Sequence, residues 1–394
     1  MLFSRRRILQ LSAASTLIFP RQAFAATGER KFLFVFCPGG WDQCAFSAPL
    51  FDSEHVDMIV EGATANINGI TFVDSSLHPA IRTFLETHGD SSVLINGIEA
   101  RSVAHDVCVR LSCTGFSDTR YDDWPSIIAA HAQNNPLLPQ VHLSGPSFTE
   151  KYSSEVVRIG NEAQLLKLLE MTPLSTNLEA LSTDFLLENL PNTDHPFASK
   201  SAQLLNNIQE VDASLLNTSQ TLNQSFNLVE QIFSQDLAKS IMLSYTGVRD
   251  LGWDTHAGNH MQHWHLEELF TELTAFLTTL KNRQALSGRR LLDEVTIVVM
   301  SEMGRFPRFN FRDGRDHWTF TSAWLMGAGI AGGQTIGGWD SYCLGKAIDL
   351  TTGTANEQGV LLTPKNFGAT LLHLADIDPL SLLDAAPITA ALSD

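Results

Sequence analysis

The sequence of 394 residues predicts an α/β protein with a mostly parallel central sheet and helices on both of its faces. Short apolar strand patterns alternate along the chain with longer amphipathic patterns at helical spacing. Two strand patterns, 31–37 and 295–300, are almost continuously apolar, which is typical of strands buried on both faces of a parallel sheet. Because 44% of the residues are hydrophobic, the chain can build a full core.

Each expected element has its own local signal. Strands are expected at 31–37, 92–95, 140–143, 295–300 and 323–327, with helical patterns at 78–87, 123–134 and 263–281 between them. The first strand ends at Pro38, and the β-branched run 295–300 lies between Glu294 and Gly304. Strands that alternate with helices favour a parallel sheet with helices packed on each side.

Residues 161–246 have a different composition and contain no glycine, although the whole chain has 26. Apolar residues recur at helical spacing from Leu204 to Leu215 and again from Leu222 to Ile241. We expect two long helices here, inserted between sheet elements of one α/β domain that covers 26–394.

The first 25 residues are predicted to be a removable export signal. Arg5, Arg6 and Arg7 precede a short apolar stretch, and this pattern resembles the twin-arginine export signal. Ala23-Phe24-Ala25 supplies the small residues at which a signal peptidase cleaves. The apolar stretch is too short to span a bilayer, and no later segment is long enough, so we expect a periplasmic or secreted protein that uses the twin-arginine machinery.

Charge excludes one class of function. The chain carries a formal charge of −17, and the predicted signal contains four arginines and no acid, so residues 26–394 carry −21. Non-specific DNA or RNA binding needs a basic surface, and we therefore expect no nucleic-acid partner.

Carboxylates and histidines follow several predicted strands, where ligands bind in open α/β sheets. Asp254 and His256 flank one residue in a loop, so their side chains could converge on one ion. Asp42, after Gly39-Gly40, and His317 are natural further ligands. Carboxylate and imidazole together suit a divalent metal such as Zn²⁺ or Mn²⁺. His260, His263 and His265 enter a predicted helix, where a structural role is expected.

A second cluster is basic. Four arginines lie within eleven residues of this acidic chain: Arg305, Arg308, Arg312 and Arg315. Guanidinium groups match phosphate, sulfate or carboxylate with paired donors, so Arg305 above all is a candidate contact for a substrate anion. The alternative is that these arginines pair with the many acidic residues.

Five cysteines leave at least one thiol free: Cys37, Cys44, Cys108, Cys113 and Cys343. Their spacing matches no zinc or haem motif, and a role as small buried hydrophobic residues is favoured. Cys108–Cys113 and Cys37–Cys44 disulfides remain open alternatives.

Together these motifs resemble the DUF1501 family over about residues 30 to 380. The blocks that carry the resemblance are Gly39-Gly40-Trp41-Asp42, Leu77-His78-Pro79, His105, Gly115, Gly252-Trp253-Asp254-Thr255-His256, Met300-Ser301-Glu302-Met303-Gly304-Arg305-Phe306-Pro307 and Asp316-His317-Trp318. Members typically carry twin-arginine signals, and the family is similar to the alkaline phosphatase and sulfatase superfamily, so the resemblance implies an alkaline-phosphatase-like fold.

The resemblance also implies a site. The implied metal ligands are Asp42, Asp254, His256, Glu302 and His317. His105 lies where the superfamily places its nucleophile, at a helix N-terminus that favours an anion. The chain departs from the two-metal phosphatases at Met303, where they have histidine, and it has no sulfatase Cys-x-Pro-x-Arg motif.

Two functions follow. The first is an exported metal-dependent hydrolase of a phosphate or sulfate ester, with His105 and Arg305 as catalytic residues and an anionic small molecule or polymer as substrate. The second is a non-catalytic extracytoplasmic protein that binds an anionic ligand on the same scaffold. The absence of a recognisable nucleophile favours the second function, and the set of metal-ligand residues favours the first.

Overall fold

The computed structural model describes residues 30–134, 136–158, 210–212 and 221–393. An eight-stranded sheet forms its centre, in the order β12-β4-β11-β8-β1-β7-β5-β6. The strands are β1 (Lys31–Phe36), β4 (Ser92–Glu99), β5 (Gln140–His142), β6 (Val156–Arg158), β7 (Ser240–Ser244), β8 (Val295–Met300), β11 (Phe320–Gly327) and β12 (Gln334–Ile336). Only β11 runs antiparallel to its two neighbours, β4 and β8, so the predicted mostly parallel α/β fold is confirmed.

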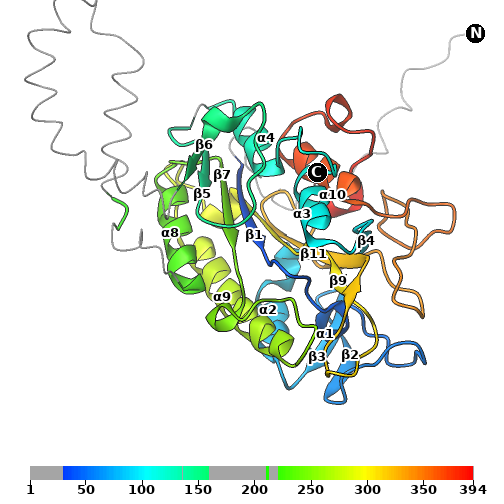
Figure 1. The fold of residues 1–394 in the computed structure, drawn as a ribbon. Helices are drawn as coiled ribbons and strands as arrows, with labels where there is room; N and C mark the ends of the chain where they lie inside the picture. The colour runs from blue at the N-terminus through cyan, green and yellow to red at the C-terminus, as the bar shows by residue number, and fades with distance from the viewer. Residues whose placement is uncertain (1–29, 135, 159–209, 213–220, 394) are drawn as a thin grey trace, which may run out of the picture.

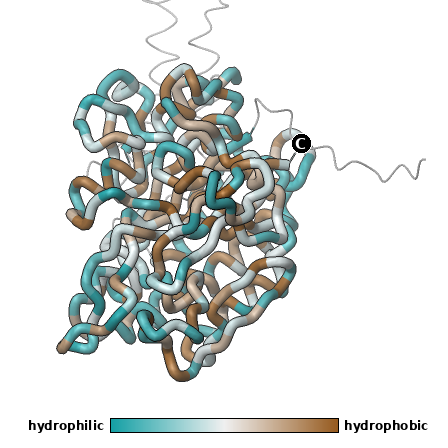
Figure 2. Tube along the Cα trace, turned by 90° about the vertical axis from the view of Figure 1, so that its right-hand side faces the viewer, coloured by the Kyte–Doolittle hydropathy of each residue, from teal (hydrophilic) through white to brown (hydrophobic). Residues whose placement is uncertain are grey.

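Helices cover both faces of this sheet (Figure 1). On one face lie α2 (Ala80–His88), α8 (Leu222–Ser234) and α9 (Met261–Asn282), and on the other lie α3 (His105–Thr114), α4 (Trp124–Ala130) and α10 (Pro364–Leu374). Side chains of β1 alternate between the two cores: Leu33 and Val35 face the first, and Phe32, Phe34 and Phe36 face the second. Figure 2 shows the apolar segments gathered inside and polar segments on many outer loops.

Small elements at one edge complete the fold. The short helix α1 (Gln43–Phe46) follows the loop after β1, and β9 (Gly304–Arg305) pairs antiparallel with β10 (His317–Trp318). A separate hairpin joins β2 (Gly62–Ile67) to β3 (Ile70–Ser75). Its turn is Asn68-Gly69, and both residues have positive φ angles, as a tight two-residue hairpin turn requires.

Part of the expected helical insertion is replaced by a strand. The second periodic pattern is a helix from Leu222 to Ser234, with a capping box at Thr221, but Ile241 lies in strand β7. Asp236 adopts a left-handed conformation with φ of 52°, which ends the helical path. The first pattern, from Leu204 to Leu215, lies mostly outside the described residues, as does the expected signal 1–25.

Candidate metal centre

Five segments meet at the sheet edge where β1, β7 and β8 end, because parallel strands share their carboxyl edge. The segment after β7 carries Asp254 and His256, and Glu302 follows β8. Strand β4 also ends at this edge because two antiparallel pairings separate it from β8, and His105 begins the helix that follows it. His317 lies just before the antiparallel strand β11 and so reaches the same edge from the opposite chain direction.

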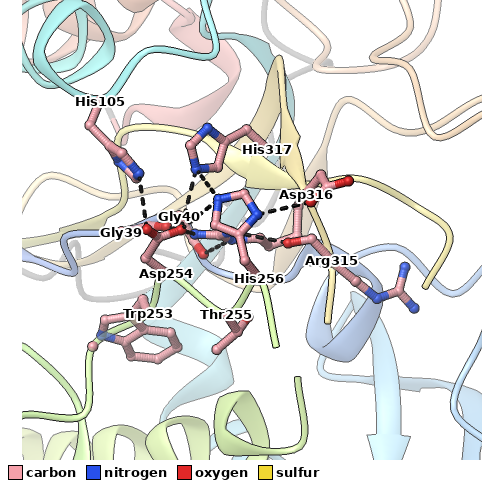
Figure 3. A network of polar contacts seen from close by, with 12 residues as sticks. Gly39, Gly40, His105, Trp253, Asp254, Thr255, His256, Arg315, Asp316 and His317 are labelled. Atoms are coloured by element: carbon pink, nitrogen blue, oxygen red, sulfur yellow. Dashed lines mark hydrogen bonds and ion pairs between the residues drawn. The ribbon is translucent and has the colours of Figure 1, made fainter. Parts of the chain in front are cut away.

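Four of these side chains converge (Figure 3). Ligand atoms of His105, Asp254 and His317 all lie within 4.8 Å of one another. His256 joins them, with its Nε2 atom 2.9 Å from Nε2 of His317 and 3.3 Å from Oδ1 of Asp254. Imidazole nitrogen and carboxylate oxygen are a ligand set for Zn²⁺ and related divalent ions, so we call these four residues the candidate metal-ligand cluster.

Each imidazole of the cluster is anchored through its Nδ1 atom, which leaves Nε2 facing the others. Nδ1 of His105 lies 2.8 Å from Glu302 Oε1, and Nδ1 of His256 lies 2.9 Å from Asp316 Oδ1. Nδ1 of His317 lies 2.7 Å from the carbonyl oxygen of Val103. When Nδ1 donates a hydrogen bond to such an acceptor, the tautomer is fixed and Nε2 presents its lone pair, as in histidines that bind metals.

The atom Nε2 of His105 is the best single test of whether a metal fits. It is buried and has no hydrogen-bond partner, and Asp254 Oδ2 lies 3.5 Å away. An unpartnered buried polar atom needs a ligand to offset its desolvation. A divalent ion shared with Asp254 and His317 would satisfy it.

Arg305 holds the carboxylate of the cluster from below. Its Nη2 atom lies 2.6 Å from Oδ1 of Asp254, and the side chain has no exposed surface. The other donors bind backbone: Nε to Gly40 O at 2.9 Å, Nη1 to Arg315 O at 3.1 Å, and Nη2 also to Gly39 O. The structure does not place Arg305 as a direct contact for a substrate anion, because its side chain has no exposed surface and four of its five N–H donors bind within the protein.

Neighbouring groups shift the pKa values of Asp254 and His105 in this cluster. Partial burial raises the pKa of Asp254, but the hydrogen bond and charge of Arg305 outweigh it and hold this pKa below its usual value. The hydrogen bond that His105 donates to Glu302 raises the pKa of His105. Asp254 is therefore ionised at neutral pH, and Glu302 makes the His105 imidazole a more basic ligand.

The loop after β1 depends on two glycines. Gly39 and Gly40 have φ angles of 119° and 84°, which other residues rarely adopt. A Cβ atom on Gly39 would lie 2.6 Å from the backbone nitrogen of Asp254. The backbone nitrogen of Gly39 instead donates to Glu302 Oε1 at 2.8 Å, so this loop packs closely under the cluster.

Glu302 lies beside the cluster rather than in its open centre. Its side chain is 1% exposed, and Oε1 already accepts hydrogen bonds from His105 and Gly39. Oε2 accepts one from Ser301. The geometry assigns Glu302 to the orientation of His105 and not to direct ligation.

Asp42 is not brought to the cluster. Its Oδ2 atom lies 3.0 Å from Arg315 Nε and 2.7 Å from Asn259 Nδ2, and its Oδ1 atom caps helix α1 at Cys44 N. Both charged side chains of the Asp42–Arg315 pair are almost completely buried. The expected ligand is therefore a structural ion pair that ties the β1 loop to the segment before His317.

The four arginines do not form one anion pocket. Arg305 and Arg315 are buried in ion pairs. Arg308 donates to the carbonyl oxygens of Glu54 and His55, and the guanidinium of Arg312 lies 5.3 Å from the ring centre of Phe311. The alternative interpretation, pairing with acidic residues of the protein itself, holds for the two buried arginines.

His260, His263 and His265 pack at the start of helix α9, as expected. His263 stacks on His78 with ring centres 5.1 Å apart, and His265 contacts Gly252 O and Val248 N. His260 packs edge-to-face against the half-exposed Trp264. They belong to the packing around α9 and not to the cluster.

The candidate metal-ligand cluster is open to solvent. Exposed fractions of its side chains range from 19% for His317 to 46% for Asp254. Helix α3 begins at His105 without a side-chain cap, so its free backbone N–H groups and the positive end of its dipole lie next to the cluster. Among the described residues, no Ser, Thr or Cys side chain hydrogen-bonds to the four ligands.

Within the part of the chain that the structure describes, no helix has the length and apolar character to cross a bilayer. No curated protein matches the sequence.

Several solved structures resemble this fold at low sequence identity. The lipoteichoic acid synthase LtaP from Listeria monocytogenes has a TM-score of 0.44 and 10% identity, with 94% of this chain and 78% of LtaP covered. A phosphonate monoester hydrolase of Agrobacterium radiobacter has a TM-score of 0.42 and 10% identity, with 93% of this chain and 78% of the hydrolase covered. A protein in the alkaline phosphatase superfamily from Vibrio parahaemolyticus has a TM-score of 0.41 and 10% identity, with 93% of this chain and 71% of the other chain covered.

Residues 205–386 match the model of the family described as "Protein of unknown function (DUF1501)", in agreement with the resemblance that the sequence motifs carry.

Proposed function

We propose that this chain is an exported hydrolase of phosphate or sulfate esters that uses one divalent metal ion, Zn²⁺ or Mn²⁺. The observation that carries the proposal is the arrangement of His105, His256 and His317, whose anchored imidazoles direct Nε2 toward Asp254. A bound divalent ion supplies a Lewis acid that polarises an ester oxygen and lowers the pKa of water.

The protein's own groups divide the remaining work. Glu302 and Asp316 hold two of the imidazoles in the tautomer that presents Nε2, and Arg305 fixes the carboxylate of Asp254. The N-terminus of α3 offers backbone N–H groups to an anion beside the cluster. In the net reaction, the oxygen of water bonds to phosphorus or sulfur, and the bond to the leaving alcohol breaks.

Among the described residues, no Ser, Thr or Cys side chain hydrogen-bonds to the four clustered residues, and this favours direct attack by water over a covalent intermediate on the protein. Met303 supports a single ion, because it is fully buried in an apolar cluster with Ala100 and Cys108. A thioether in that place is a poor ligand for a second hard or borderline ion.

The same two features support the second candidate function, a non-catalytic protein that binds an anionic ligand outside the cytoplasm on the same scaffold. The two functions differ in the fate of the bound ester. Export through the twin-arginine machinery belongs to both and rests on Arg5, Arg6 and Arg7 with the segment that follows them.

The test begins with the metal content of the full chain purified without chelators. We expect one equivalent of a transition metal, and loss of it in Asp254→Asn and His317→Gln. His373→Gln, a change of an exposed histidine in α10, is the matched control. A folded protein that binds no Zn²⁺ or Mn²⁺ in titration would contradict the metal-dependent hydrolase.

Turnover then separates the two functions. The loaded protein is assayed with 4-nitrophenyl phosphate, 4-nitrophenyl sulfate and bis(4-nitrophenyl) phosphate. Hydrolysis that chelator abolishes and added metal restores supports the hydrolase. Binding of these esters without any product favours the binding protein.

A further inference from the structure

Two cysteines that are distant in sequence meet beside the candidate metal centre. The Sγ atoms of Cys44 and Cys343 are 4.0 Å apart, although 299 positions separate the residues. Both side chains are at most 1% exposed. Cys44 lies in helix α1, directly after the loop that carries Gly39 and Gly40, and Cys343 lies in the loop after Asp340.

The pair has a defined environment. Cys44 and Cys343 pack with Ala48, Val56, Phe320 and Trp339 in a small apolar cluster of their own. The amide of Gln43 donates to Sγ of Cys343 at 3.5 Å. Among the described residues, no other two cysteine thiols are within hydrogen-bond distance, and Cys37, Cys108 and Cys113 pack in other apolar clusters.

The backbone of Cys343 is a second, independent observation. Its φ angle is 60°, in the left-handed region that normally selects glycine or asparagine. The turn around it is closed by Asp340, whose carboxylate accepts from the backbone nitrogens of Tyr342 and Leu344. A cysteine held in this costly conformation points to a role for its side chain, because glycine would fit the turn without strain.

We propose that Cys44 and Cys343 form a disulfide when the chain folds in the presence of a disulfide oxidant. One thiolate attacks the oxidant R–S–S–R and releases R–S⁻, and the second thiolate then displaces R–S⁻ from the mixed disulfide. Two cysteine thiols are oxidised, one R–S–S–R is reduced to two R–SH, and the two protons go to the released thiolates. The sulfur atoms must approach by about 2 Å to reach the bonded distance of about 2.05 Å.

The bond is expected to form during folding rather than afterwards. The hydrogen bond between the two thiols and their burial raise the pKa of Cys44 well above its usual value, so the reactive thiolate is scarce in the folded protein. Complete burial also keeps an oxidant away from both sulfur atoms.

The disulfide would link two segments that support the candidate metal centre. Next to Cys44, the side chain of Gln43 donates to Arg305 O at 2.6 Å and accepts from Arg305 N at 2.9 Å. The carbonyl oxygen of Cys343 accepts from Trp318 Nε1 at 2.8 Å, and Trp318 follows His317. A covalent bond here joins the supports of Arg305 and His317 without touching a metal ligand.

Peptide mapping of the full chain tests the proposal directly. The protein is unfolded, reduced, and refolded with oxidised glutathione, and remaining thiols are then alkylated before cleavage after Lys and Arg. Cys44 falls in the peptide 32–82 and Cys343 in 316–346, whereas Cys108 and Cys113 fall in 102–110 and 111–120. We expect 32–82 linked to 316–346 as the dominant oxidised species, and a higher unfolding midpoint for the oxidised than for the reduced protein.

Matched variants identify the sulfur atoms. Because Cys37 shares the peptide 32–82, Cys37→Ser should keep the link and Cys44→Ser should abolish it. Cys343→Ser and Cys343→Gly should both abolish the link and the difference between the two midpoints, and Cys343→Gly relieves the backbone strain if the serine variant folds poorly. Alkylated Cys44 and Cys343 after oxidative refolding, or a link that survives in Cys44→Ser, would overturn the proposal. The result is independent of metal content and of ester hydrolysis.

Discussion

The guanidinium of Arg305 donates to the carboxylate of Asp254 from beneath, at 2.6 Å, while one side of that carboxylate remains open to solvent. Arg305 is thus a buried supporting residue, and Asp254 is a partly exposed candidate ligand. Arg305 sits on the carbonyl oxygens of Gly39, Gly40 and Arg315, so the position of Asp254 is set by the loop after β1 and by the hairpin that carries His317. The support should therefore control metal affinity although it touches no metal.

Arg305→Lys should weaken metal binding while it keeps the positive charge. Lysine cannot reproduce the planar fork that reaches Asp254 and three carbonyl oxygens together. We expect about 10-fold to 100-fold weaker binding of Zn²⁺ or Mn²⁺, the usual cost of losing a residue that orients a ligand. Calorimetric titration measures this. Arg312→Lys, at an exposed position of the same loop, is the control and should bind normally.

Glu302→Gln should affect the metal through His105. The amide can still accept one hydrogen bond, but it removes the negative charge that makes the imidazole a stronger ligand. We expect metal affinity to fall about tenfold or more, with the fold retained in circular dichroism. A folded Glu302→Gln protein with unchanged affinity would show that His105 does not bind the ion. Glu99→Gln, at the end of β4, serves as the control for a change of charge.

Asp42→Asn separates a structural role from ligation. The change leaves the buried guanidinium of Arg315 without its partner, and breaking a buried ion pair costs about 3–5 kcal/mol. The free energy of unfolding in urea should fall by about this amount, while metal affinity of the folded variant stays at the wild-type value. Asp313→Asn, exposed in the adjoining turn, should change neither quantity. Loss of metal by folded Asp42→Asn would restore Asp42 as a ligand.

The sheet and most of the cluster could be predicted from sequence because their signals are local. The runs 31–36 and 295–300 are apolar enough to indicate buried strands, and Asp254 and His256 lie in a loop that follows a strand. Strand β7 was missed because its residues continue the helical spacing of α8, and only the left-handed Asp236 separates the two. The hairpin β2–β3 had a usable signal in Asn68-Gly69.

The roles of the carboxylates could not be predicted, because they depend on contacts between distant loops. Asp42 and Asp254 both follow glycine-rich turns, and each meets a different arginine of the segment 305–315. Asp316 had one signal, its position next to His317, but its contact with His256 spans 60 positions. Val103 contributes a backbone oxygen to His317, which no side-chain pattern reveals.

Acid should destabilise the protein through His78. Burial lowers the pKa of this imidazole to about 4, against 6.5 in the unfolded chain. Between pH 6.5 and pH 4, His78 is therefore mostly protonated in the unfolded chain and mostly neutral in the folded protein. The free energy of unfolding falls as pH falls through this range. The loss is about 2 kcal/mol at pH 5 and about 3 kcal/mol at pH 4.

Urea denaturation at several pH values measures this loss. His78→Phe keeps a planar ring against His263, and its pH dependence should be shallower than that of the wild type by about 2 kcal/mol between pH 7 and pH 5. His373→Gln, which changes an exposed imidazole, should follow the wild-type curve. Equal curves for His78→Phe and the wild type would mean that His78 is protonated in the folded protein as easily as in the unfolded chain.

Charge balance at the centre predicts which esters the proposed hydrolase prefers. Arg305 cancels the charge of Asp254, so a divalent ion would balance Glu302 and Asp316 and leave the site nearly neutral. No cation of the described residues other than Arg305 forms an ion pair with the clustered carboxylates, apart from the histidines themselves. The second charge of a phosphate monoester would therefore face these carboxylates without compensation, at a cost of roughly 2 kcal/mol for a separation near 7 Å.

We therefore expect kcat/KM for bis(4-nitrophenyl) phosphate and 4-nitrophenyl sulfate to exceed that for 4-nitrophenyl phosphate at pH 8, where the monoester is a dianion. Intrinsic reactivities of these esters differ, so the decisive quantity is the change in their ratio in Asp316→Asn at saturating metal. Removing this largely exposed negative charge should shift the ratio toward the dianion by roughly threefold, because solvent screens the charge. An unchanged ratio, with hydrolysis still sensitive to chelator, would reject the charge argument and leave the hydrolase proposal standing.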